Sequence, residues 1–141
     1  MIERRHVRRM TLVILVATVL LVAGDVIGAL TGKPLGFPYT PLGVISLLVY
    51  LTVGLLGALR TNFAVGVLAA ASVGFLDGTL GPLLAWLAGP GSVGQTITEP
   101  RIFAYSAAVG TVAAAVAGLI GAAAGSWVER RRGIQRTRAA P

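Results

Sequence analysis

The sequence contains no cysteine and only one histidine, His6. The absence of cysteine excludes disulfide bonds, thiolate chemistry and cysteine-based metal sites. A single histidine in a basic segment cannot build a histidine-based metal cluster. We therefore expect neither a metal nor a cofactor.

Charged residues are also scarce. They make up 12% of the 141 residues, and 55% of the residues are hydrophobic. Soluble domains carry about a quarter charged residues. A chain this short and this apolar cannot bury its apolar surface in a water-soluble core. The composition therefore predicts an all-α integral membrane protein, for which the bilayer acts as the solvent.

Motifs for several common chemistries are missing as well. The sequence has no Walker-type phosphate loop and no H-E-x-x-H zinc motif. A Ser-His-Asp triad would need His6, which we expect on the opposite side of the membrane from the polar residues described below. The sequence therefore does not indicate an enzyme.

Four apolar runs are long enough to cross a bilayer, which takes a helix of about 20 residues. They cover residues 10–31, 41–59, 62–88 and 102–128, between basic tails at 1–9 and 129–141. The connection at 60–62 is so short that the runs on either side must form a helical hairpin. We predict a single domain, residues 1–141, folded as an up-down bundle of four transmembrane helices.

Glycine and proline mark the other connections, at 32–40 and 89–101. Pro82 lies near the end of the third run, where a proline favours a kink or a break because it removes a backbone hydrogen bond.

Positive charge is distributed unevenly along the chain. The two tails and the 60–62 turn hold four, five and one arginines, whereas the other side has only Lys33 and Arg101. By the positive-inside rule, both termini face the cytoplasm. The net charge of +7 is concentrated at the chain ends, which favours anionic lipid headgroups over nucleic acid as the partner. The arginine-rich, lysine-poor composition suggests a prokaryotic inner membrane.

Small residues recur every four positions in the third and fourth runs. They are Gly66, Ala70, Gly74 and Gly78, and then Gly110, Ala114 and Gly118. Residues four apart share one helix face, and small side chains there allow a neighbouring backbone to come close. This pattern predicts small-xxx-small packing, and it leaves faces that suit a homo-oligomer or another membrane subunit.

Two aspartates occur within the apolar runs. Asp25 lies fifteen residues after Met10, and Asp77 lies fifteen residues after Asn62. At 1.5 Å per residue both are roughly 22 Å from the cytoplasmic face of a core about 30 Å thick. The two carboxylates are therefore predicted at one depth, in the outer third of the membrane.

The two remaining runs contribute polar side chains near the same level. The candidate ion or substrate site comprises Asp25, Asp77, Ser46, Tyr50, Tyr105 and Ser106.

Two functions remain open from the sequence. The aspartates can be structural, reaching headgroup water or hydrogen-bonding a neighbouring helix, in a non-enzymatic membrane component or partner subunit. Alternatively, they form a proton, cation or substrate site in a small oligomeric transporter or channel, because intramembrane charges are usually functional.

Overall fold

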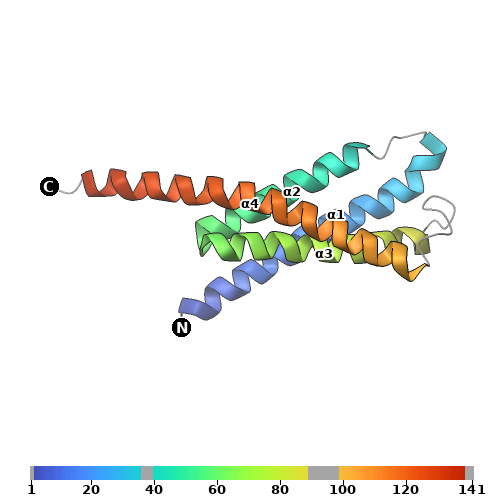
Figure 1. The fold of residues 1–141 in the computed structure, drawn as a ribbon, viewed down its shortest axis with the longest axis horizontal. Helices are drawn as coiled ribbons and strands as arrows, with labels where there is room; N and C mark the ends of the chain where they lie inside the picture. Colours follow the sequence, from blue (N-terminus) through green and yellow to red (C-terminus); the bar gives the residue numbers. More distant parts are fainter. Residues whose placement is uncertain (1, 36–39, 89–98, 139–141) are drawn as a thin grey trace.

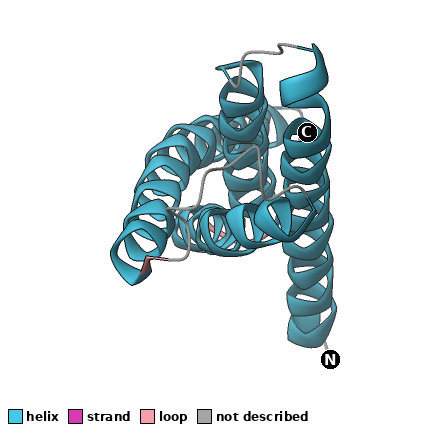
Figure 2. Ribbon diagram, turned by 90° about the vertical axis from the view of Figure 1, so that its right-hand side faces the viewer, coloured by secondary structure: helices cyan, strands magenta, loops and turns pink. Residues whose placement is uncertain are grey.

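The computed structural model describes residues 2–35, 40–88 and 99–138. Regular structure in these residues consists of helices, as both ribbon views show (Figures 1 and 2). The helices are α1 (Ile2–Leu35), α2 (Thr40–Arg60), α3 (Phe63–Ala88) and α4 (Pro100–Arg138). The prediction of an all-α protein with four long helices is confirmed.

Each helix contains a stretch that is long and apolar enough to cross a bilayer. These stretches are Arg8–Leu30, Gly43–Arg60, Phe63–Leu87 and Pro100–Arg131. They match the predicted runs in number and order, with ends that differ by a few residues. Together they indicate a multi-pass membrane protein.

The helices extend beyond the predicted runs at both chain ends. α1 begins at Ile2 and α4 continues to Arg138, so that the basic tails prolong the helices, and α4 projects past the other helices (Figure 1). α3 also continues through Pro82 to Ala88 rather than breaking there. Residues 36–39 and 89–98 of the two predicted connections, and the last three residues of the C-terminal tail, lie outside the described residues.

The turn between α2 and α3 is fixed by local hydrogen bonds. The Thr61 amide donates to the Gly57 carbonyl at 3.0 Å, which closes the last turn of α2. The Asn62 side chain then accepts a 2.9 Å hydrogen bond from the Val65 amide. Asparagine in this position is a favoured helix N-cap, because it satisfies a backbone donor that the first turn leaves free. The chain therefore reverses within two residues.

Glycines set the distances between neighbouring helices. A Cβ placed on Gly78 of α3 would lie 2.8 Å from the Ser106 carbonyl oxygen of α4, and one placed on Gly110 of α4 would lie 2.8 Å from the Gly74 carbonyl oxygen. A Cβ on Gly54 of α2 would collide with the backbone of Gly118 of α4. Helices α2, α3 and α4 therefore approach one another with backbone against backbone. α1 packs more closely on α3 than on α2 and runs obliquely to α3 (Figure 1).

The interior of the molecule is made of small side chains. Ala70, Val73, Ala114 and Ala122 are completely buried. Large aliphatic side chains face outward instead, and Leu68 is 65% exposed. In water this arrangement would leave an extensive apolar surface uncovered, whereas in lipid it lets small residues form the helix interfaces. The packing therefore supports a membrane setting independently of the composition.

Hydroxyl side chains on the helices donate hydrogen bonds to backbone carbonyls of their own helix. The Ser72 hydroxyl donates to the Leu68 carbonyl at 2.8 Å, and the Thr52 hydroxyl donates to the Leu48 carbonyl at 2.7 Å. Both residues are exposed, and both bonds reach back one helical turn. Such bonds allow serine and threonine to face hydrocarbon without an unpaired donor.

Candidate functional site

The two intramembrane aspartates meet across the α1–α3 interface, above a glycine. A Cβ on Gly81 of α3 would collide with Oδ2 of Asp25, and it would lie 3.6 Å from Oδ1 of Asp77. Both carboxylates therefore border the small space that the missing side chain of Gly81 leaves. Two helices far apart in sequence each contribute one acidic group to this space.

Tyr50 completes the cluster from α2. It is 3% exposed, and its hydroxyl donates a hydrogen bond to Oδ2 of Asp77. Ser46 lies one turn earlier on α2, within hydrogen-bonding reach of the same hydroxyl. We name Asp25, Tyr50, Asp77 and Gly81 the carboxylate cluster. Three helices thus supply its polar groups.

The carboxylate cluster contains more hydrogen-bond acceptors than the neighbouring donors satisfy, and no positive charge among the described residues is paired with it. Oδ1 of Asp77 is buried and has no hydrogen-bond partner among the described residues. Within residues 2–35, 40–88 and 99–138, no lysine or arginine forms an ion pair with Asp25 or Asp77. Ionised carboxylates only accept hydrogen bonds, and two of them close together repel each other. A proton or a cation bound between them would relieve that repulsion.

The fourth helix does not add a polar side chain to the cluster. Tyr105 is 72% exposed, and within the described residues it makes no hydrogen bond to either aspartate. Ser106 meets α3 through its backbone carbonyl at Gly78. Depth along a helix does not fix which way a side chain points, and α4 turns its face of small residues, including Ala114, toward the bundle. The structure thus brings together four of the six predicted residues: Asp25, Asp77, Tyr50 and Ser46.

Two residues of interest were missed by the sequence reasoning. Gly81 directly precedes Pro82, at which the sequence suggested a kink or a break, and it provides the room for Asp25. Thr18 of α1 is 8% exposed, and its hydroxyl has no partner in the described part of the chain. Thr18 precedes Asp25 by seven residues, which is two helical turns, so that its position on the inner face could have been recognised from spacing.

The donor set limits what the carboxylate cluster can bind. Among the described residues, no group of three or more histidine, cysteine, aspartate or glutamate side chains could hold a metal ion. Two carboxylates and a phenol suit a proton or a small cation.

Comparison with protein-family models, with curated proteins and with solved structures finds no match for this chain. The functional argument therefore rests on the geometry of the protein itself.

Proposed function

We propose that this protein is a small transporter or channel, and that its carboxylate cluster binds a proton or a small cation. The observation that carries the proposal is the convergence of Asp25 and Asp77 on Gly81, without a basic partner among the described residues. Placing a charged aspartate in a bilayer core costs about 2.5–3.5 kcal/mol on insertion scales. Binding of a proton or a small cation would neutralise part of this charge and so lower the free-energy cost of keeping two aspartates in the bilayer core.

The proposal includes an up-down arrangement of the helices, with both termini in the cytoplasm of a prokaryotic cell. The contacts support alternating directions, because Gly74 lies against Gly110 whereas Gly78 lies against Ser106. Residue numbers thus rise along α3 as they fall along α4. The excess of arginine in the tails and in the 60–62 turn supports the orientation.

We also propose that α3 and α4 pack through their small residues at four-residue spacing, the small-xxx-small pattern. The glycines of α3 and α4 are supported as packing positions by the neighbours that a Cβ would meet. Anionic headgroups are the partners we assign to the basic tails. The role is non-enzymatic, and the outward faces of the helices suit a homo-oligomer or association with another membrane subunit.

A structural role is the second candidate, and one observation favours it. The hydrogen bond from Tyr50 to Asp77 joins α2 to α3 inside the molecule. In this alternative the aspartates position helices in a membrane component that transports nothing. Hydrogen bonds between helices in membranes average only about 0.6 kcal/mol, so that such a bond positions the two helices more than it stabilises them. Asp25 is not a partner in this bond.

Ion flux in proteoliposomes tests the proposal. The full chain would be reconstituted, and proton, sodium and potassium movement would be measured under imposed gradients. We expect flux above that of empty vesicles, and a loss of at least about tenfold in Asp25→Asn and in Asp77→Asn. Glu129→Gln is the matched control, because Glu129 is an exposed carboxylate outside the cluster. Unchanged flux in both asparagine variants would favour the structural role.

A further inference from the structure

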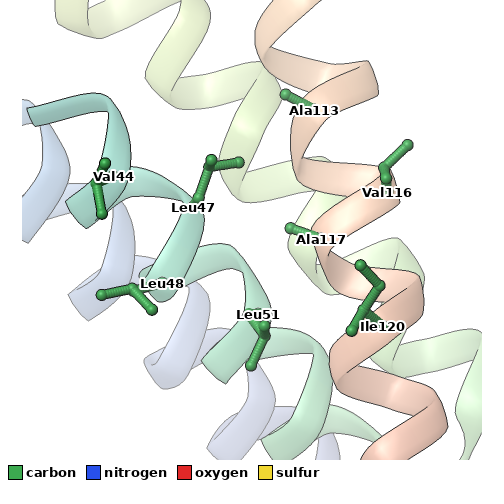
Figure 3. Close-up of a pocket in the computed structure, with 8 residues that line it drawn as sticks. All are labelled: Val44, Leu47, Leu48, Leu51, Ala113, Val116, Ala117 and Ile120. Carbon is green, nitrogen blue, oxygen red and sulfur yellow. The ribbon is translucent and has the colours of Figure 1, made fainter. Parts of the chain in front are cut away.

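Two open apolar grooves lie on the outer surface of the helices, and they differ in charge. The groove between α2 and α4 has a volume of about 590 Å³ and is lined only by aliphatic side chains (Figure 3). The groove between α1 and α2 has a volume of about 510 Å³, and Arg60 and Thr52 line it together with aliphatic residues. We name the second one the α1–α2 groove. Of these two grooves, the α1–α2 groove is the one that combines an apolar surface with a cation.

The α1–α2 groove exists because α1 packs mainly on α3. Figure 2 shows α1, which carries the N label, standing along one side of the molecule. The groove is lined by Leu12, Val16 and Leu20 of α1 and by Leu48, Leu56 and Arg60 of α2. The three α1 side chains are more than half exposed. An elongated apolar surface therefore runs between the two helices toward the end of α2.

Positive charge gathers at that end of the α1–α2 groove. Arg60 is the last residue of α2 and is exposed. The Met10 methyl carbon lies 3.4 Å from the position that a Cβ on Gly57 would occupy, which puts the start of the apolar part of α1 beside the last turn of α2. Arg8 and Arg9 precede Met10 and are also exposed. No acidic residue is among those that line the groove.

We propose that the α1–α2 groove binds an anionic glycerophospholipid of the bilayer, with an acyl chain along the groove and the phosphate at Arg60. The aliphatic lining matches the chain, and a guanidinium can form two parallel hydrogen bonds with phosphate oxygens. The neighbouring arginines add attraction for a headgroup with net negative charge. This site does not depend on the function of the carboxylate cluster, since none of the cluster residues lines the groove.

Lipid binding to the purified full chain tests the proposal. Native mass spectrometry in detergent would compare phosphatidylglycerol with phosphatidylcholine of the same acyl chains. We expect tighter binding of phosphatidylglycerol, and Arg60→Gln should weaken it about fivefold, since one basic residue near a membrane surface contributes about that factor. Arg101→Gln is the matched control, because Arg101 is an exposed arginine at the start of α4.

A second pair of variants tests the apolar part of the groove. Val16→Trp should fill the α1–α2 groove and weaken binding of both lipids. Val116→Trp fills the α2–α4 groove instead and should leave binding unchanged. These valines are 53% and 52% exposed, so that each tryptophan can be placed without disturbing the core. If Arg60→Gln fails to fold, the two tryptophan variants still test whether lipid binds in the α1–α2 groove.

Three results would overturn the assignment. Equal affinity of the wild type for the two lipids would remove the role of charge. Equal effects of Val16→Trp and Val116→Trp would remove the role of the groove. A dimer that dissociates in Val16→Trp, with no lipid retained in the wild type, would assign the groove to a second copy of the chain.

Discussion

Asp25 of α1 lies over Gly81 of α3, in space that any larger residue would occupy. This contact brings an acidic group from the first helix beside Asp77 on the third. Glycine at this position is therefore needed for the carboxylate cluster, and its replacement is the simplest structural perturbation of the site.

Gly81→Ala is expected to destabilise the protein by about 1–3 kcal/mol, the usual cost of inserting a methyl group into a packed site. The added Cβ would collide with Oδ2 of Asp25 and displace that side chain. Unfolding in detergent measures the loss of stability, and proteoliposome flux should fall with it. Gly24→Ala is the control, because a Cβ on Gly24 would meet nothing within 4 Å although it is next to Asp25. Equal stability of the two variants would show that the contact at Gly81 is loose.

Tyr50→Phe removes the only side-chain donor that bonds to Asp77 among the described residues. We expect a loss of about 0.6 kcal/mol, the average for hydrogen bonds between membrane helices, and at most about 1.7 kcal/mol. Tyr105→Phe should change nothing, because Tyr105 is 72% exposed and lies away from the cluster. Unfolding of the two variants side by side measures the difference.

The same pair of tyrosine variants separates the two candidate functions. A transport role predicts that Tyr50→Phe also alters ion flux, since the hydroxyl orients Asp77. A structural role predicts lower stability with no flux to alter. Identical behaviour of Tyr50→Phe and Tyr105→Phe in both assays would contradict either account of the hydrogen bond.

Gly74→Ala tests the close approach of α3 and α4. A Cβ on Gly74 would collide with the Ala114 side chain and would lie 2.5 Å from the Gly110 carbonyl oxygen. We expect a loss of about 1–3 kcal/mol in unfolding experiments, because both neighbours are held by a helix backbone. Gly43→Ala lies in open space and should be neutral or slightly stabilising, since alanine favours helix by about 1 kcal/mol. A neutral Gly74→Ala would mean that the two helices can separate without cost.

Thr18→Val should stabilise the protein by about 1 kcal/mol, because it removes a buried hydroxyl that has no partner among the described residues. Thr52→Val is the comparison, because Thr52 is exposed and its hydroxyl is bonded to Leu48. Thermal unfolding of both variants in one detergent measures the difference. A loss of stability or of flux in Thr18→Val would instead indicate that this hydroxyl serves the site.

The four helices could be predicted because apolar runs of bilayer length leave little choice of fold. Counting residues from the helix ends also predicted that Asp25 and Asp77 lie at one depth, and the structure brings them together at Gly81. Rotation about the helix axis could not be obtained in this way. It depends on which faces pack, and α4 packs with its small residues, which leaves Tyr105 outside.

Helix ends were the other feature that the sequence could not supply. The sequence predicted membrane spans at 10–31 and 102–128 flanked by basic tails, whereas helix α1 begins at Ile2 and helix α4 ends at Arg138. Pro82 suggested a break, yet α3 continues through it. A proline is tolerated in a membrane helix where neighbouring helices and local adjustments compensate for the lost hydrogen bond.

Infrared difference spectroscopy of the carboxyl groups tests most directly whether Asp25 and Asp77 form one binding site. Spectra of the reconstituted protein would be recorded as pH, sodium or potassium is changed, for the wild type, Asp25→Asn, Asp77→Asn and Glu129→Gln. We predict a carboxyl band that responds to the proton or to one of these cations, that is lost in either aspartate variant, and that persists in Glu129→Gln. A wild-type band that does not respond, or a response that survives in both aspartate variants, would contradict the account.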